Sequence, residues 1–340
     1  MHAQGPARNM RRMELAWRTL TRDDAEALAE LNAAAEAVDK TDDHYGAEDF
    51  IEDLEGHSVD PVDGSRGGFV DGRPVVAGVV HARTAADPAH RMYFWGLVHP
   101  EFRRRGLGRA LTEWALEAGA RITERRFPGA PGELLAPVAD TLAGNAALFQ
   151  ACGFTTDRYE FGMALPLAGR EAATSRVPEG FTLFNYEDAL AQEFRATHND
   201  AFVPDHPGST VQTVESWPHV ADPSSPSFRQ DFSFGLRDEA TGVLAGYLFA
   251  RYFEADTAAT GRRDLYLNYI GTRREYRGRG IASALINTVA DGAAAAGFDS
   301  VSLHVYADNP TGALGVYERV GFAVRHRLNI FKRPTSHELE

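Results

Sequence analysis

Several residue types that particular classes of protein require are scarce in this 340-residue sequence. It has one cysteine, Cys152, which excludes an internal disulfide framework and a cysteine-rich zinc or iron–sulfur site. Such cysteine usage is typical of a reducing compartment, so we expect a cytoplasmic protein. No apolar run approaches the roughly 18 residues of a membrane-spanning helix. Residues 1–14 lack the apolar core of a secretory signal, and we predict a flexible leader there.

Positive charge is also in deficit. Lys and Arg number 35 against 48 Asp and Glu, which gives a net charge of −13. An acidic chain lacks the broad basic face on which non-specific binding to nucleic acid or to anionic membranes depends. The Arg-Gly-Arg-Gly run at 277–280 leaves nucleic-acid binding as an alternative, which the net charge and the lack of interleaved aromatic residues disfavour. Length and the 44% share of hydrophobic residues predict two globular domains.

The sequence contains an internal repeat. The segment EFRRRGLGRAL at 101–111 matches EYRGRGIASAL at 275–285, with six of eleven positions identical. Two further pairs occur in the same order, VVAGVVHAR at 75–83 with VLAGYLFAR at 243–251, and LFQACGF at 148–154 with VYERVGF at 316–322. Three pairs in one order at a nearly constant offset indicate two copies of one domain.

We predict that the first repeat covers 15–165 and the second repeat covers 179–333, with a linker at 166–178 and a tail at 334–340. Each repeat should begin with a capped helix, near Thr21 in one and near Asn185 in the other. A hairpin and a further strand should follow, then the arginine–glycine segment and a helix with an apolar face. A strand, a short helix and a Gly-Phe dipeptide precede the last strand of each repeat.

The arginine–glycine segment is the candidate ligand site. A glycine-rich turn that opens a helix directs unpaired backbone N–H groups, and the positive end of the helix dipole, at a ligand. Glycine allows close approach, and the neighbouring arginines add charge, so the turn suits a pyrophosphate. The sequence has no Gly-Lys-Ser/Thr and no GxGxxG, which excludes a Walker loop and a dinucleotide fingerprint. One such segment alone could be a solvated helix start; its repetition in the same context favours function.

These segments resemble the acyl-coenzyme A binding motif of the GNAT superfamily of N-acyltransferases. DNPTGALGVYERVGF at 308–322 resembles the closing motif of that superfamily. The resemblance covers nearly the whole chain, which is similar to tandem acetyltransferases such as the mycothiol synthase family. It implies an α/β (α+β) fold in which each repeat has a mixed, mostly antiparallel sheet flanked by helices. The sheet would splay between its fourth and fifth strands, where pantetheine would lie.

The resemblance also implies acetyl-CoA as the acyl donor, no metal, and a set of binding residues. Backbone groups around Val98, and around Ile270 and Thr272, would bind pantetheine and the acyl carbonyl. Asn309 falls where the family often has an asparagine near the coenzyme. The pyrophosphate would be wrapped by two turns, whose residues are Arg103, Arg104, Arg105, Gly106 and Gly108 in the first repeat and Arg277, Gly278, Arg279, Gly280 and Ala282 in the second.

Direct transfer by such a family requires a base for the amine and an acid for the sulfur. Tyr317 matches the tyrosine that protonates the departing thiolate. Asp264 falls where the histone-acetylating branch carries its catalytic glutamate. The mycothiol synthase family has a glutamate two residues later, where this chain has Tyr266, and strand alternation places both residues on one face. A solvated acid at the strand end fits Asp264 equally well, and His304 on the following strand is a further candidate.

The first repeat departs from this pattern. Phe149 occupies the position of Tyr317, and AGNAALF does not reproduce the spacing of the asparagine. We therefore expect a first repeat that is degenerate, able to bind coenzyme A without transferring an acyl group. Cys152 lies in its closing helix, where we expect it to pack rather than react.

The insertion at 202–230 is the candidate binding region for the amine that accepts the acetyl group. This insertion carries acidic and aromatic residues that would suit a cationic amine, although a mobile loop fits equally well: Asp205, His206, Glu215, Trp217, His219 and Asp222. We expect the C-terminal domain to move an acetyl group from acetyl-CoA to the primary amine of a small molecule by direct attack. We expect no nucleic-acid or membrane partner and a monomer or homodimer. The alternative is a non-catalytic acyl-CoA sensor, which the degenerate first repeat favours and Tyr317 disfavours.

Overall fold

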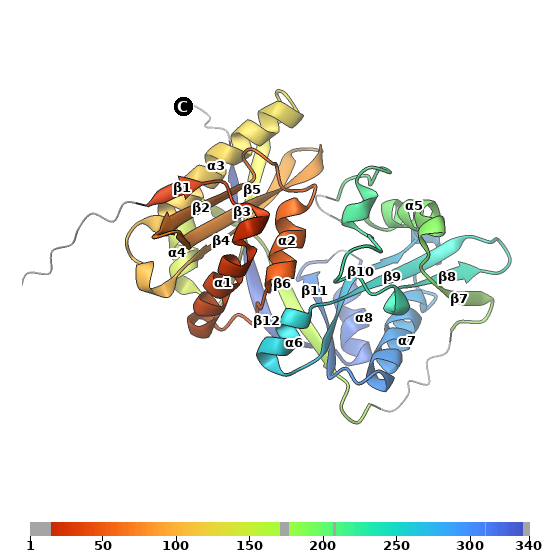
Figure 1. The fold of residues 1–340 in the computed structure, drawn as a ribbon. Helices are drawn as coiled ribbons and strands as arrows, with labels where there is room; N and C mark the ends of the chain where they lie inside the picture. Colours follow the sequence, from red (N-terminus) through yellow and green to blue (C-terminus); the bar gives the residue numbers. More distant parts are fainter. Residues whose placement is uncertain (1–14, 171–176, 207–208, 310, 336–340) are drawn as a thin grey trace, which may run out of the picture.

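The structure is a computed structural model that describes residues 15–170, 177–206, 209–309 and 311–335. The expected leader, residues 171–176 of the expected linker and residues 336–340 of the tail lie outside these ranges. Two successive halves of the chain lie side by side and meet along a central pair of strands (Figure 1).

The two halves contain matching series of elements. The first half holds β1 (Ala16–Arg18), α1 (Ala25–Asp39), α2 (Ala47–Glu55), β2 (Ser65–Val70), β3 (Arg73–Ala86), β4 (His90–Val98), α3 (Leu107–Arg126), β5 (Gly132–Ala139), α4 (Ala143–Ala151) and β6 (Thr155–Pro166). The second half holds β7 (Phe181–Asn185), α5 (Ala191–Phe202), β8 (Phe234–Asp238), β9 (Leu244–Tyr252), α6 (Glu254–Thr260), β10 (Asp264–Thr272), α7 (Ile281–Ala295), β11 (Ser300–Tyr306), α8 (Ala313–Val320) and β12 (Ala323–Pro334). Short 3-10 helices occur at Arg22–Asp24, Pro100–Phe102, Asp188–Leu190, Trp217–His219, Gln230–Phe232 and Arg274–Tyr276.

Local sequence signals account for two boundaries in the first repeat. The turn between β2 and β3 uses Asp71 and Gly72 at φ of 49° and 79°, as a two-residue hairpin requires. At the predicted start of the first helix, the Thr21 N–H donates to the Asp24 carboxylate at 2.9 Å. The prediction for the second repeat is wrong in detail. Asn185 ends β7, its side chain donates to the carbonyl of Gln230 at 3.3 Å, and α5 begins only at Ala191.

All strands join one sheet in the order β1-β2-β3-β4-β5-β12-β6-β11-β10-β9-β8-β7. Neighbouring strands are antiparallel except for the pairs β4–β5 and β10–β11, which confirms the expected mixed, mostly antiparallel architecture. The two repeats exchange their last strands. β6, from the first repeat, pairs with β11, and β12, from the second, pairs with β5. The predicted domain limits are continuous along the chain, whereas this pairing crosses them.

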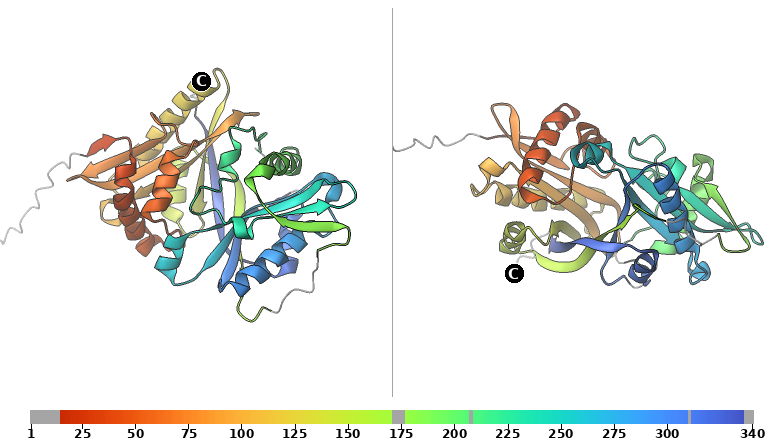
Figure 2. Two further views of the ribbon diagram at one scale, coloured as in Figure 1. Left: turned by 45° about the vertical axis from the view of Figure 1, so that its right-hand side comes forward. Right: turned by 90° about the horizontal axis from the view of Figure 1, so that it is seen from below.

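Each half of the sheet buries both of its faces. In the first repeat, Val76 and Val80 pack with α3, whereas Ala77 and Val79 pack with α1 and α2 on the opposite face. In the second repeat, Leu248 and Ala250 pack with α7 and α8, and the alternate residues of β9 pack with α5. The helices on both faces are visible in the two views of Figure 2. Over the described ranges, every helix is too short or too polar to cross a membrane.

Candidate active site

A cavity of about 710 Å³ lies where β10 and β11 diverge. These strands pair in parallel over residues 264–266 and 300–302. Beyond that point, the separated edges at 267–272 and 303–306 line the cavity. The expected splay between the fourth and fifth strands is therefore confirmed in the second repeat.

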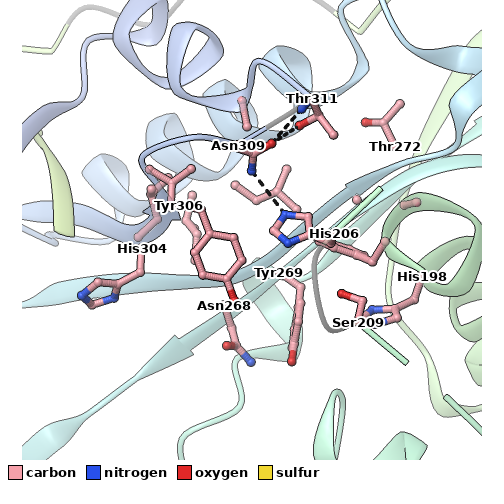
Figure 3. Close-up of a pocket in the computed structure, with 18 of the residues that line it drawn as sticks. His198, His206, Ser209, Asn268, Tyr269, Thr272, His304, Tyr306, Asn309 and Thr311 are labelled. Atoms are coloured by element: carbon pink, nitrogen blue, oxygen red, sulfur yellow. Dashed lines mark hydrogen bonds between the residues drawn. The ribbon is translucent and has the colours of Figure 1, made fainter. Parts of the chain in front are cut away.

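A β-bulge shapes one wall of this cavity. The register between β10 and β9 shifts between Leu267 and Tyr269, so Asn268 is an extra residue. An extra residue in a ladder leaves backbone polar groups unpaired and re-aims the neighbouring side chains. Asn268 and Tyr269 both lie at the cavity (Figure 3). The equivalent ladder of the first repeat keeps an unbroken register from Val76–Val98 to Ala82–Met92, so this feature is specific to the second repeat.

The arginine–glycine turn forms the second wall. Gly278 and Gly280 have φ of 76° and 79°, and Gly280 is the residue before α7. The hydrogen bond from Ala284 N–H to the Gly280 carbonyl closes the first turn of α7, so the N–H groups that precede Ala284 have no intrahelical acceptor. Gly278, Gly280 and Ala282 line the cavity, and the space at both glycine Cα atoms is open to 4 Å. Backbone donors and open space fit a diphosphate.

Arg277 braces this turn instead of pointing freely at a ligand. Its guanidinium contacts the Asp205 carboxylate at 2.6 Å and donates to the Ala201 carbonyl at 3.0 Å. The hydrogen bonds from Arg277 and Arg274 lower the pKa of Asp205. Arg279 lies on the exposed side, with its guanidinium 5.0 Å from the centre of the Tyr276 ring. The implied contacts to a pyrophosphate would therefore come from the backbone rather than from the Arg277 side chain, and Arg279 is not among the residues that line the cavity.

The first repeat has an equivalent of the Arg277–Asp205 ion pair, because Arg103 contacts Asp39 at 2.7 Å. The two ion pairs therefore allow matched variants. We expect Asp205→Asn to raise the KM for acetyl-CoA about three- to fivefold, as loss of a solvent-accessible ion pair would, with kcat largely retained. Asp39→Asn should leave that KM unchanged. Steady-state kinetics on both variants would check this, and equal effects at the two positions would contradict it.

Three residues from different elements meet in the cavity. Tyr317, on α8, is 8% exposed, and burial raises its pKa to about 12. The Thr272 hydroxyl oxygen, at the end of β10, is buried without a hydrogen-bond partner among the described residues. Asn309 pairs through its Nδ2 with His206 Nε2 at 3.2 Å, and its Oδ1 accepts from Thr311 (Figure 3). The sequence-predicted residues Ile270, Thr272, Asn309 and Tyr317 thus line one cavity.

Asp264 does not belong to this group. It lies in the part of β10 that is still paired with β11, and its two carboxylate oxygens accept hydrogen bonds from Ser300 and Ser302. It is not among the residues that line the cavity. The sequence placed Asp264 correctly on a strand, but strand position alone does not say where two strands diverge. We therefore do not retain it as the base.

The other two candidates lie near each other. The Tyr266 hydroxyl is 3.3 Å from His304 Nδ1, and His304 Nε2 is 3.2 Å from His326 Nε2. His304 lines the cavity, but burial and the neighbouring His326 lower its pKa to about 4. His304 is therefore neutral near pH 7 and a weak proton acceptor.

The first repeat places its equivalent residues differently. Phe149 packs in an aromatic cluster, with its ring centre 6.2 Å from Phe94, 5.1 Å from Phe154 and 6.1 Å from Phe331. Cys152 is buried in the same core, as expected. A second cavity, of about 930 Å³, lies against this repeat. It is lined by Phe149 but by none of the predicted binding residues of the first repeat, Val98, Arg103, Arg104, Arg105, Gly106 and Gly108.

The insertion at 202–230 contributes fewer acidic side chains to the cavity lining than the sequence predicted. His206 and His219 line it, and burial lowers the pKa of each imidazole. Asp205 is engaged by the arginines of the turn, and Trp217 is buried in the core beside α5. The insertion therefore lines the cavity with imidazole, hydroxyl and amide groups, in place of the acidic side chains that the sequence suggested.

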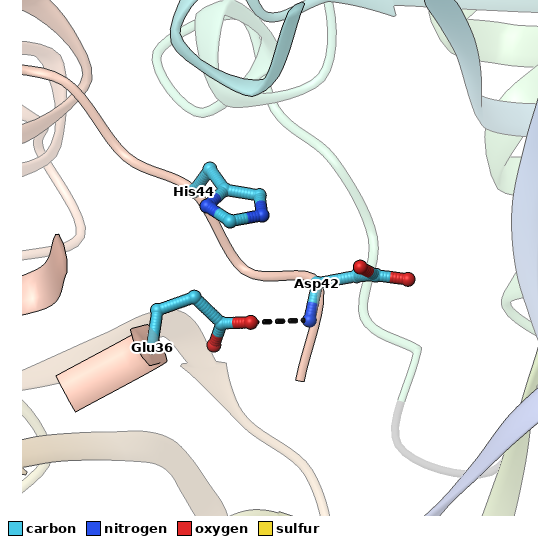
Figure 4. A group of neighbouring side chains, drawn as sticks. All are labelled: Glu36, Asp42 and His44. Carbon is cyan, nitrogen blue, oxygen red and sulfur yellow. Dashed lines mark hydrogen bonds between the residues drawn. The ribbon is translucent and has the colours of Figure 1, made fainter. Parts of the chain in front are cut away.

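One group of possible metal ligands occurs among the described residues, formed by Glu36, Asp42 and His44 (Figure 4). The Glu36 carboxylate accepts hydrogen bonds from the Thr41 N–H at 3.0 Å, the Thr41 hydroxyl at 2.6 Å and the Asp42 N–H at 2.9 Å. These bonds fix the chain after α1, which accounts for the position of Glu36 without an ion.

Comparison with known families identifies both repeats. Residues 191–322 match the acetyltransferase (GNAT) family, and residues 68–156 match an acetyltransferase (GNAT) domain. Mycothiol acetyltransferase from Brachybacterium faecium is 30% identical over 237 residues. The matched region is 68% of this chain and 65% of that protein, so the chain spans slightly less than two thirds of the length of that relative. Mycothiol acetyltransferase from Streptomyces avermitilis is 30% identical over 251 residues, 71% of this chain and 70% of that protein.

Solved structures show the same tandem fold. A GCN5-related N-acetyltransferase from Sphaerobacter thermophilus superposes with a TM-score of 0.74 at 24% identity, over 94% of this chain and 96% of that one. A tandem GNAT protein from the clavulanic acid biosynthesis pathway superposes with a TM-score of 0.67 at 20% identity, over 95% and 99% of the two chains.

Proposed function

Because this chain belongs to the GNAT family of acyl-CoA-dependent N-acetyltransferases, we propose that its second repeat transfers the acetyl group of acetyl-CoA to the primary amine of a small molecule. The observation that carries this proposal is an asymmetry between the repeats. The β-bulge at Asn268, the turn at Gly280 and the phenol of Tyr317 face one cavity. The first repeat has a regular ladder and Phe149 at the corresponding positions.

Different groups in this cavity would serve the separate steps of direct acetyl transfer. The N–H groups at the start of α7 would hold the diphosphate of acetyl-CoA, and the open edge of β10 would hold pantetheine. A backbone N–H at the bulge would donate to the thioester oxygen as negative charge develops on it. Tyr317 would give its proton to the sulfur when the C–S bond breaks. The raised pKa of Tyr317 keeps the phenol protonated until that step.

The acceptor is best sought by direct assay. The curated relatives named above are mycothiol acetyltransferases, so desacetylmycothiol is the first amine to test. Tyr266 stands where the mycothiol synthase family has a glutamate, and therefore aminoglycosides and amino acids belong in the same panel. We expect release of coenzyme A from acetyl-CoA that depends on one class of amine. Tight binding of acetyl-CoA with no release under any amine would contradict the enzyme and favour the sensor.

A further inference from the structure

The cavity of the second repeat contains a carboxyl group that comes from the first repeat. Glu160 lies on β6, the exchanged last strand of the first repeat, opposite Tyr306 of β11 and Leu328 of β12. Its neighbours Phe161 and Met163 pack into the core against α7 and α8. Because the odd-numbered residues Phe161 and Met163 face that core, strand alternation directs Glu160 to the opposite face. Glu160 lines the cavity on that face.

This carboxyl group is not engaged in holding the fold together. Among the described residues that line the cavity, Glu160 carries the one carboxylate. Within the described ranges it makes no hydrogen bond or ion pair through its side chain, whereas both oxygens of Asp264 are occupied by serine hydroxyls. Burial raises the pKa of Glu160 to about 7, against the opposing effect of Arg158 and Arg83. A base with a pKa near the working pH is the most effective proton acceptor.

The imidazoles of the cavity are weaker candidates for the same task. Burial lowers the pKa of His198 to about 4, and its Nδ1 is 2.6 Å from the Tyr247 hydroxyl. His304 has a pKa of about 4 for the reason given above. At pH 7 a group with so low a pKa binds the proton of an ammonium ion poorly.

We propose that Glu160, supplied by the first repeat through the exchanged strand, accepts the proton of the acceptor's ammonium group in the site of the second repeat. This inference rests on the proposed function. One ammonium proton passes to the Glu160 carboxylate, and the nitrogen lone pair then forms the C–N bond. The C–S bond breaks, the sulfur takes the Tyr317 proton, and the surplus proton on the new amide nitrogen restores the Tyr317 phenol. The site of the second repeat is therefore incomplete without the first.

Several titratable groups surround Glu160 and will shape its titration. Arg158 lies on the same strand, and Arg83 faces it from β3. Burial raises the pKa values of Tyr266 on β10 and Tyr306 on β11, and the nearby Glu160 charge adds to this effect. The other titratable groups that line the cavity are Tyr93, Tyr269, Tyr276, Tyr317, His81, His198, His206, His219, His304, Arg277 and Arg319, and His326 lies next to His304.

The test compares full-length wild type, Glu160→Gln and Asp264→Asn, using the best acceptor amine of the panel. For wild type, kcat/KM should fall below an apparent pKa of about 7, because protonated Glu160 cannot accept a proton. Glu160→Gln should lose about 10²-fold in kcat/KM at pH 7.5. Its rate should rise continuously toward pH 9.5 as free amine accumulates, with no inflection near 7. Asp264→Asn should keep that inflection.

Two readouts besides turnover keep the outcomes separate. Acetyl-CoA affinity by calorimetry should be equal in wild type and Glu160→Gln. Burial raises the folded-state pKa of Glu160 to about 7, so the unfolded chain releases this proton at a lower pH than the folded chain, and the wild type loses stability as pH rises toward 7. The glutamine variant should therefore have a higher Tm than wild type at pH 8.5, and the difference should nearly vanish at about pH 4. Active wild type together with a Glu160→Gln variant that keeps the acidic inflection would overturn the role of Glu160 alone. Wild type that binds acetyl-CoA and acetylates no amine would overturn the proposed function, and this inference with it.

Discussion

Replacing Tyr317 by phenylalanine should lower kcat by about 10²–10⁴, the usual contribution of a positioned general acid. The Kd for acetyl-CoA should change little, because the ring and its packing beside Phe322, at 6.0 Å between ring centres, are retained. The natural Phe149 at the equivalent position of the first repeat shows that the fold accommodates this side chain. Rapid-quench measurement of acetyl transfer, together with calorimetric binding of acetyl-CoA, would separate the two effects.

A stability control belongs beside this variant. Tyr317 is 8% exposed, so removal of its hydroxyl should leave the Tm close to that of wild type. A variant with normal Tm, normal Kd and full kcat would show that another group protonates the sulfur. Loss of kcat together with a large fall in Tm would instead point to a structural effect, and Tyr317→Leu would then provide a comparison that removes the ring as well.

Replacing Gly280 by glutamate should abolish binding of acetyl-CoA, with an affinity loss of at least about 10²-fold. Gly280 has φ of 79° and no atom within 4 Å of a Cβ placed there, so the added side chain enters the space beside the start of α7. A carboxylate at this point repels the diphosphate and occupies the path of its approach. Isothermal titration with acetyl-CoA measures the effect directly.

The first repeat supplies a matched control for that substitution. Gly106 has φ of 83°, precedes α3 and also has open space at the Cβ position. Gly106→Glu therefore imposes the same backbone strain without altering the cavity of the second repeat. We expect a similar fall in Tm for both variants and near-normal acetyl-CoA affinity at the second-repeat site for Gly106→Glu. Equal loss of that affinity in both would mean that the strain, rather than the position of the carboxylate, is responsible.

The sequence was sufficient for the repeat, the family and the residues carried by local motifs. The turn at 277–282 could be predicted because helix starts with positive-φ glycines have a short-range signature. Tyr317 and Asn309 could be placed because they belong to the same short helix and the loop before it. These features depend on residues that are close along the chain.

Features that depend on pairing between distant strands could not be predicted. The exchange of β6 and β12 joins residues more than 130 positions apart along the chain. Strand alternation alone does not say which repeat each of these strands will pair with. The place of Glu160 in the second-repeat cavity could not be predicted for the same reason, because the local sequence does not show that β6 pairs with β11. The distance of Asp264 from the cavity could not be predicted either, because alternation gives the face of a strand but not the point at which its partner strand diverges from it.

We propose that the second repeat carries out the chemistry. Steady-state release of coenzyme A by Gly106→Glu and by Tyr317→Phe, measured with the same acceptor and corrected for folded protein, tests it most directly. We predict that Gly106→Glu keeps a turnover near that of wild type and that Tyr317→Phe loses about 10²-fold or more. If Gly106→Glu loses its turnover while Tyr317→Phe keeps full activity, the chemistry takes place in the first repeat.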